Sequence, residues 1–240
     1  MSYSLIVYCV PTGSIQKTVG SNDEILLAEM KSKYAEALRV NDEFFEEDEE
    51  DFDDEESGSS GGGVFGFLGK LLGKGNAPAQ MPSGAYPTSE QILEALIRGE
   101  EIDPRCGSKA AYVFEQVCRH LGEQMAGDAF FSLRRSDQWF KSVSKVIEKG
   151  GLKSSQFSIS DHLQNWGPII DLPAPDDFPG MGYLTFEEAS VAAPLLSAPS
   201  IDEAAKKDEN AEYMVMAVGD IRNWLKCCVD RQGDLVAFYY

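Results

Sequence analysis

Residues 3–10 read YSLIVYCV and residues 235–240 read LVAFYY, and these two apolar runs decide the fold. Both runs are rich in β-branched and aromatic residues, which favour strands. Turn residues bound them, with PTG at 11–13 after the first run and QG at 232–233 before the second. Because each run is apolar on both faces and lies next to a helix, we expect the two ends of the chain to meet as strands of one sheet.

Between these strands, apolar residues at helical spacing predict a series of helices. We expect them over residues 21–40, 88–99, 108–125, 136–148, 187–196 and 212–229, with short strands at 156–159 and 183–186. The fold class is therefore α+β. The expected architecture is a single domain in which several helices pack on a small sheet that includes both terminal strands.

An acidic tract at residues 42–56 interrupts this pattern. Twelve of its fifteen residues are Asp or Glu, none is Lys or Arg, and SGSSGGG follows at 57–63. The like charges repel one another, and little apolar area offsets the entropy of ordering the tract. We therefore expect a disordered acidic and Gly/Ser/Pro-rich insertion at 41–86, which divides the α+β domain into a first part at 1–40 and a remainder at 87–240.

Within the insertion, residues 64–74 read VFGFLGKLLGK and form a short amphipathic segment. Its three glycines weaken any helix by about 1 kcal/mol each relative to alanine. One interpretation is a peptide that binds a membrane surface. We favour the other, in which the segment docks on its own domain or stays beside its acidic neighbour.

The overall charge of the chain narrows the classes of partner. With 40 Asp and Glu against 21 Lys and Arg, the net charge is −19. Binding to phosphate groups needs clustered basic side chains, so neither nucleic acid nor an anionic membrane surface is an expected partner. Because no apolar run is long enough to span a bilayer and the chain does not start like a secretory signal, we expect a cytoplasmic protein without stable membrane insertion.

The five cysteines are odd in number and irregularly spaced, and they contain no Cys-x-x-Cys pair. This pattern predicts reduced thiols, with neither a disulfide framework nor a zinc site. Cys106 precedes a predicted helix start, where a thiolate is favoured, and it is the best candidate for a reactive cysteine. The vicinal pair of Cys227 and Cys228 has a redox interpretation as well, but we favour core packing, because adjacent residues on a helix point about 100° apart.

The sequence carries no recognised catalytic signature. It lacks the nucleophile elbow, the zinc-protease motif, the P-loop and the dinucleotide glycine fingerprint. Its two histidines, His120 and His162, are expected at a helix flank and at the head of a loop. We therefore expect no cofactor and no metal, and we favour a protein that is not an enzyme.

Four stretches of the chain carry a resemblance to a known family. They are SNDEILL at 21–27, ID at 102–103 with KAAYVF at 109–114, GYLTFEE at 182–188, and WL at 224–225 with GDLVAF at 233–238. In these stretches the sequence resembles the YfbM-like family of small bacterial proteins. The resemblance implies a mixed α+β fold and a bacterial source. The family has no established activity, so the resemblance implies no site residues.

Our first functional hypothesis is an interaction protein that uses its acidic tract to engage a basic protein partner. Concentrated negative charge steers a basic partner over long range and raises the rate of association. An immunity or antitoxin-like role, in which the acidic tract blocks the nucleic-acid groove of a cationic toxin, agrees with this physics. The partner-binding residues expected are Glu46, Glu47, Asp48, Glu49, Glu50, Asp51, Asp53 and Asp54.

The alternative is a small-molecule- or metal-binding domain, or an enzyme, with a pocket near the loop at 161–179. Aromatic and charged side chains in this loop supply an apolar wall and polar contacts. Neighbouring carboxylates also suit a hard cation, although the interleaved prolines favour an extended connector. The residues expected in this pocket are Asp161, His162, Trp166, Asp176 and Asp177. We favour the first hypothesis.

Overall fold

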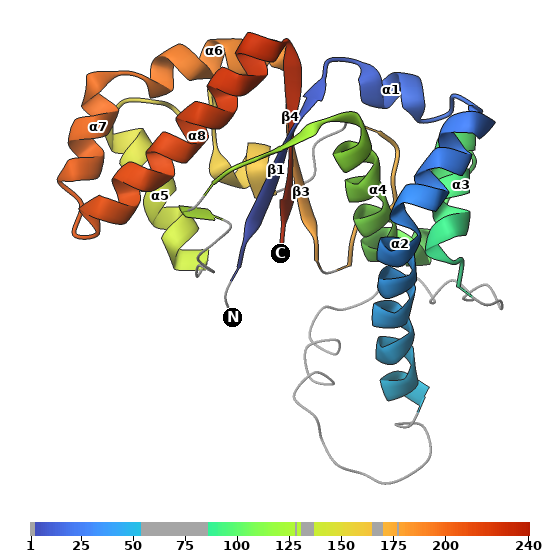
Figure 1. Cartoon of the computed structure of the whole chain (residues 1–240). Helices are drawn as coiled ribbons and strands as arrows, with labels where there is room; N and C mark the ends of the chain where they lie inside the picture. The colour runs from blue at the N-terminus through green and yellow to red at the C-terminus, as the bar shows by residue number, and fades with distance from the viewer. Residues whose placement is uncertain (1–2, 54–85, 128, 131–136, 165–169, 177) are drawn as a thin grey trace, which may run out of the picture.

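The computed structural model describes residues 3–53, 86–127, 129–130, 137–164, 170–176 and 178–240, with side chains left out at 47–53 and 137. Within these residues, a four-stranded sheet runs through the middle of the molecule and helices cover both of its faces (Figure 1). The α+β class is confirmed, and the insertion falls between two helices of one domain. Among the described helices, none is long and apolar enough to cross a membrane.

The two ends of the chain form the centre of the sheet. The strands are β1 (Leu5–Pro11), β2 (Glu123–Met125), β3 (Gly180–Leu184) and β4 (Gly233–Tyr239), in the order β2-β1-β4-β3. All three neighbouring pairs are antiparallel, and β1 pairs with β4 from Leu5 opposite Tyr239 to Pro11 opposite Gly233. The predicted pairing of the terminal strands is confirmed.

The alternation of side chains along the central strands divides the interior into two cores. Leu5, Val7 and Cys9 point from β1 into one core, whereas Tyr8 and Val10 point into the other. Residues of β4 alternate in the same way, because successive side chains of a strand face opposite sides of a sheet. Both faces of the central strands are therefore buried, as their continuous apolar sequences predicted.

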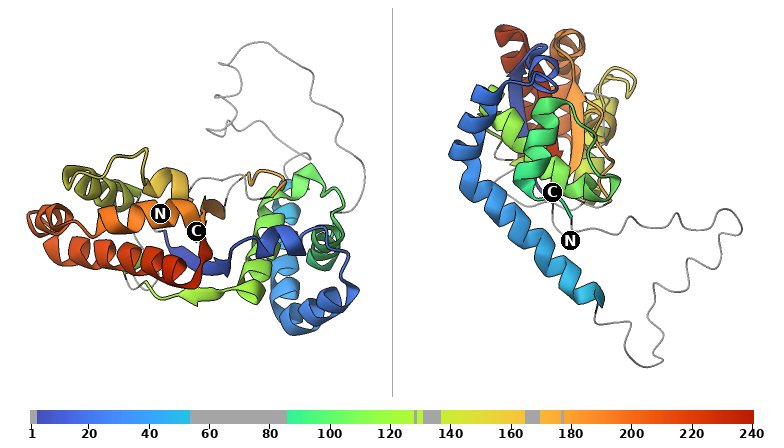
Figure 2. Two further views of the ribbon diagram at one scale, coloured as in Figure 1. Left: turned by 90° about the horizontal axis from the view of Figure 1, so that it is seen from above. Right: turned by 90° about the vertical axis from the view of Figure 1, so that its right-hand side faces the viewer.

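Each core is completed by its own set of helices, as Figures 1 and 2 show. The core that contains Tyr8 is covered by α1 (Ser14–Thr18), α2 (Glu24–Asp53), α3 (Ser89–Arg98) and α4 (Gly107–Leu121), with a short 3₁₀ turn, η3 (Pro104–Cys106), before α4. The core that contains Cys9 is covered by α5 (Asp137–Lys149), α6 (Phe186–Leu196), α7 (Pro199–Lys206) and α8 (Ala211–Arg231). A π-helical turn, η5 (Ser160–Gln164), packs on β3 and β4.

Local sequence signals explain where several helices begin and end. Thr88 and Thr185 cap α3 and α6, and each forms a reciprocal capping box with the residue three positions later. Gly99 ends α3 in the left-handed conformation (φ 69°), which glycine adopts without steric cost. These boundaries lie within a residue or two of the predicted ones.

Several segments differ from the secondary structure that the sequence predicted, among them β3, which covers Gly180–Leu184 instead of 183–186, and α7, which was not predicted. Residues 123–125 form the edge strand β2 instead of the last turn of the preceding helix, because α4 ends at Leu121 and the chain turns at Gly122 onto β1. A Cβ atom on Gly122 would lie 2.4 Å from the carbonyl oxygen of Cys9, so only glycine permits this close approach. The strand predicted at 156–159 is wrong, since this stretch forms a turn that leads into η5.

The first long helix extends further than the sequence predicted. Asn41, Asp42 and Phe45, assigned above to the insertion, contact the domain. The helical backbone of α2 continues to Asp53. Glutamate is a good helix former, and extending an existing helix costs much less than nucleating one. Repulsion between neighbouring carboxylates weakens such a helix by only a few tenths of a kcal/mol per pair. Residues 54–85, including the amphipathic segment at 64–74, lie outside the described residues.

Candidate functional site

A buried polar cluster fixes α2 to the domain just before its acidic end. This cluster, called the Asp42 cluster below, consists of Asn41, Asp42, Ser89 and Lys109. Asp42 Oδ1 accepts hydrogen bonds from the backbone N and the Oγ of Ser89, both at 2.8 Å, and lies 2.7 Å from Lys109 Nζ. Asn41 Nδ2 donates to Ser89 Oγ at 2.9 Å. The side chains of Lys109 and Asp42 are 8% and 20% exposed, so the ion pair is largely shielded from water.

Aromatic contacts complete the attachment of α2. The ring centroid of Phe45 lies 5.8 Å from that of Tyr112 on α4, and Tyr112 in turn lies 5.4 Å from Tyr240 at the end of the chain. Earlier in α2, the buried side chains of Leu27, Met30, Tyr34 and Leu38 pack in the core with residues of α3 and α4. The direction of the helix is therefore set by the domain, and its last turns project beyond α3 and α4 (Figures 1 and 2).

The projecting end of α2 is strongly negative. Arg39 is the last basic residue of the helix, and its side chain pairs with Glu36 and Glu43. Hydrogen bonds from Arg39 lower the pKa of Glu36. Beyond Glu43 the helix carries no basic residue, and the helix dipole adds partial negative charge at the same end. Negative charge is thus concentrated at the part of α2 that lies farthest from the domain.

The predicted partner-binding residues lie along this end. Glu46 is exposed. The backbone of the next six, Glu47, Asp48, Glu49, Glu50, Asp51 and Asp53, belongs to α2. Asp54 lies outside the described residues.

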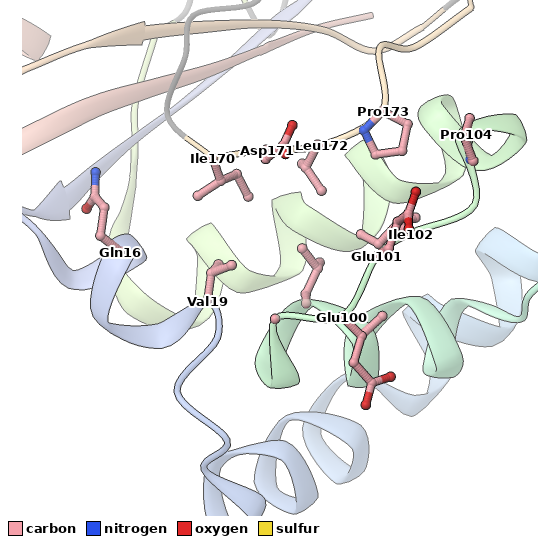
Figure 3. Close-up of a pocket in the computed structure, with 13 residues that line it drawn as sticks. Gln16, Val19, Glu100, Glu101, Ile102, Pro104, Ile170, Asp171, Leu172 and Pro173 are labelled. Carbon is pink, nitrogen blue, oxygen red and sulfur yellow. The ribbon is translucent and has the colours of Figure 1, made fainter.

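A cavity of about 660 Å³ opens between α1, the end of α3 and the loop at 170–173 (Figure 3). Ile170 and Leu172 project from the loop toward the cavity, and Val19 lies opposite them. Three carboxylate residues, Glu100, Glu101 and Asp171, stand among its lining residues, and none of the described lining residues is basic. Figure 3 shows the Glu100 carboxylate turned away from the loop. The cavity suits an organic cation with an apolar body better than an anion.

The loop predicted to form a pocket contributes to this cavity, but through residues other than those named from the sequence. Asp161, His162 and Asp176 are not among the described lining residues, and Trp166 and Asp177 lie outside the described residues. His162 Nδ1 accepts a hydrogen bond from the Ser158 backbone N at 2.9 Å, and its ring stacks on Phe157. His162 therefore supports the local fold.

The remaining residues considered for chemistry lie apart from this cavity. Cys106 is buried at the start of α4. His120 is partly buried, and its ring lies nearly perpendicular to that of Tyr34 at a centroid distance of 6.1 Å. Among the described residues, no group of three or more His, Cys, Asp or Glu side chains is arranged to hold a metal ion.

A buried polar network between α4 and the central strands was not predicted from the sequence. Glu115 is 4% exposed, and its carboxylate accepts hydrogen bonds from Tyr8 Oη at 2.7 Å, from Arg119 at 3.1 Å and from the hydroxyl of Tyr240. Burial, followed by the charge of Glu115, raises the pKa values of both Tyr8 and Tyr240. The one sign of this network in the sequence is Glu115, a carboxylate residue that stands between Phe114 and the other apolar residues of α4.

The Glu115 network has a structural role. Its carboxylate already accepts from two phenols and a guanidinium, so it is occupied by groups of the chain itself. Because Tyr8 belongs to β1 and Tyr240 follows β4, the network joins α4 to both terminal strands. A buried carboxylate satisfied in this way stabilises one arrangement of the core.

Comparison with known proteins gives one match. A family model described as "Domain of unknown function (DUF7691)" matches residues 1–57 and 76–240. No curated protein and no solved structure matches the chain.

Proposed function

The chain belongs to the DUF7691 family, whose description assigns no activity. We propose that it is a non-enzymatic interaction protein that presents an acidic helix end to a basic protein partner. The observation that carries this proposal is the placement of α2. The Asp42 cluster and Phe45 hold the helix on the domain, and the carboxylates follow directly beyond these contacts. The domain thereby fixes the direction in which the negative charge points.

The electrostatics of this helix end favour an encounter with a cation-rich surface. Carboxylates at the C-terminal end of a helix interact unfavourably with the helix dipole and repel one another. A basic partner would weaken both unfavourable interactions. Charge of one sign gathered on a projecting element also steers association over long range. Nucleic acid would be repelled.

The kind of partner that fits best is a protein with a basic groove. A toxin that binds nucleic acid has such a groove. The acidic end of α2 carries negative charge at about the density of a nucleic acid, so it would block the groove. Blocking of this kind is expected of an immunity or antitoxin-like protein. All five cysteines are free thiols, which supports a cytoplasmic encounter. A relationship to the YfbM-like family stays a prediction.

The proposal is tested by removing the charge while keeping the helix. The variant replaces Glu with Gln and Asp with Asn at the eight predicted partner-binding positions between 46 and 54, and it leaves Asp42 and Glu43 intact. In an affinity capture from the source cell, the full chain should retain a basic protein that the variant does not. The association rate with that protein should fall about tenfold to a thousandfold in the variant at low salt, and only the unmodified chain should show a steep salt dependence.

A control variant tests surface charge away from α2. It neutralises three exposed carboxylates on the opposite side of the sheet, Glu187, Glu209 and Glu212. This control should associate at nearly the rate of the unmodified chain. If the control and the variant with eight substitutions associate at equal rates and with equal salt dependence, the proposal is contradicted.

The alternative function is binding of a small organic cation in the cavity between α1, α3 and the loop at 170–173. Its support is a lining that combines an apolar wall with three acidic residues and, among the described lining residues, no basic one. Agmatine is a suitable probe, and binding should raise the melting temperature in proportion to the logarithm of its concentration. The rise should be lost in Asp171→Asn. An unchanged melting temperature at millimolar agmatine would count against this alternative.

A further inference from the structure

A groove between α2 and α4 lies just before the projecting end of α2. The two helices pack against each other (Figure 1), and the groove between them has a volume of about 260 Å³. Leu38, Val40 and Phe44 of α2 and Tyr112 of α4 form its apolar and aromatic wall. This volume lies below the range of about 300 to 1,000 Å³ that is usual for pockets of drug-sized ligands. The groove therefore suits a single side chain of a partner protein.

The wall of this groove leaves apolar surface uncovered. Val40 is 49% exposed and Phe44 is 52% exposed, although both are large apolar side chains. They lie four residues apart on α2, so they share one face of the helix. The ring centroid of Phe44 lies 6.1 Å from that of Tyr112, which places two aromatic rings at the same groove. A partner that covers this face would remove apolar surface from water.

Two buried amide oxygens of the lining have no hydrogen-bond partner among the described residues. They are Asn41 Oδ1 and Gln116 Oε1, and the two residues are only 8% and 9% exposed. The nitrogen of the Asn41 amide sets its orientation, because it donates to Ser89 Oγ at 2.9 Å and to the carbonyl oxygen of Lys109 at 3.4 Å. Buried polar atoms in proteins are nearly always hydrogen-bonded. The lining therefore favours a ligand that brings hydrogen-bond donors.

The charges around the groove favour a cation. None of the described lining residues is charged. Arg39, on the same helix, is already paired with Glu36 and Glu43. One turn beyond Phe44, the acidic residues of the projecting end begin. A positively charged group that enters the groove is therefore attracted by the end of α2 and meets no basic residue in the described lining.

An arginine side chain matches the apolar surface, the acceptors and the charge together. Its guanidinium carries five N–H donors and no acceptor, and it stacks on aromatic rings. Its aliphatic stem packs on apolar surface while the head keeps its positive charge. Lysine matches less well, because its ammonium is a compact and strongly hydrated charge without a planar face.

We propose that this groove binds an arginine side chain of the basic partner protein, an inference that rests on the proposed function. The guanidinium stacks on the rings of Phe44 and Tyr112 and donates to the unpartnered amide oxygens of Asn41 and Gln116. Neighbouring basic residues of the partner then face the carboxylates beyond Phe44. The acidic end supplies long-range attraction, whereas the groove selects arginine over lysine.

The test compares the binding of two fluorescein-labelled peptides, tetra-arginine and tetra-lysine, to the full chain by fluorescence anisotropy. The two peptides carry the same number of positive charges, so a difference in affinity reports contacts instead of long-range attraction. We expect tetra-arginine to bind about three- to tenfold more tightly than tetra-lysine. Added salt should weaken the binding of both peptides and leave this preference in place.

Two variants locate the contact in the groove. Phe44→Ser removes an exposed aromatic ring, and Gln116→Met removes an unpartnered oxygen while it keeps most of the side-chain volume. Each variant should reduce the preference for tetra-arginine to about twofold or less, with the affinity for tetra-lysine unchanged. Tyr213→Ser is the matched control, because Tyr213 is an aromatic residue on α8 that is 41% exposed. The control should keep the preference of the unmodified chain.

Several results would overturn the arginine site. Equal affinities of the two peptides for the unmodified chain would do so, as would a preference that survives in both groove variants. If the preference appears only after deletion of residues 64–74, that segment of the same chain occupies the groove and the proposal is wrong. A dimer that Phe44→Ser converts to a monomer would place a second copy in the groove, with the same consequence.

The variant with eight substitutions at positions 46–54 separates the groove from the acidic end of α2. It should bind both peptides more weakly and retain the preference for tetra-arginine. If the peptides bind equally well but depend on these carboxylates, the proposed function is supported and the arginine site is contradicted. If the preference is present but neither affinity depends on these carboxylates, the arginine site is supported and the proposed function is contradicted.

Discussion

Replacing Lys109 with methionine is expected to lower the free energy of unfolding by about 3 to 5 kcal/mol. Methionine preserves most of the side-chain volume but leaves Asp42 without its cation in a shielded site. Removing one partner of a buried ion pair strands the other charge, which costs far more than the pair itself contributes. Urea denaturation followed by circular dichroism measures the change.

Two further variants establish the cause of that loss. Lys145→Met, at an exposed position on α5, should change the free energy of unfolding by no more than about 0.5 kcal/mol. The double variant Lys109→Met with Asp42→Leu should recover part of the stability, because neither charge is then buried alone. If Lys109→Met alone costs less than about 1 kcal/mol, α2 is not held by this ion pair in solution.

Raising the pH above about 10 is expected to destabilise the protein steeply. Burial and the charge of Glu115 raise the pKa values of Tyr8 and Tyr240 in the folded state, whereas in the unfolded chain both phenols ionise near their usual value of about 10. A raised folded-state pKa gives stability that is fully present below the unfolded value and is lost as the pH rises above it. Two such groups cost together about 2.7 kcal/mol per pH unit above pH 10.

The variant Tyr8→Phe isolates one of these two phenols. It removes the hydrogen bond to Glu115, which should cost about 1.5 to 3 kcal/mol at pH 8 because the acceptor is charged. Above pH 10 its stability should fall less steeply than that of the unmodified chain, by about 1.4 kcal/mol per pH unit. Urea denaturation at pH 8, 10 and 11 gives the change in the free energy of unfolding with pH for both proteins. Equal slopes above pH 10 would contradict the raised pKa of Tyr8 in the folded state.

The parts of the fold that follow from local sequence were predictable. The pairing of β1 with β4 rests on two apolar, β-branched and aromatic runs, and α3 and α6 begin at threonine caps. The edge strand β2 was not predictable, because three residues carry too little pattern and depend on the close approach that Gly122 permits.

The extent of α2 depends on contacts that the sequence does not reveal. Charge density alone favours a disordered tract from its first carboxylate, but Asp42 is held by Ser89 and Lys109, which come much later in the chain. For the same reason the Glu115 network was not predicted, since it joins residues from distant segments of the chain. The contribution of the loop to the cavity was predictable from its apolar and acidic composition, but the residues facing the cavity depend on the position of α3.

Amide hydrogen exchange along α2 tests most directly whether the acidic helix is held by the domain. Amides from Leu27 to Asp42 should exchange at rates close to those of the core strands, and amides beyond Phe45 should show weaker protection as the helix leaves the domain. In Lys109→Met, protection at residues 38–45 should fall selectively. Exchange of residues 38–45 at the rate of an unfolded chain in the unmodified protein would contradict the attachment on which the proposed function rests.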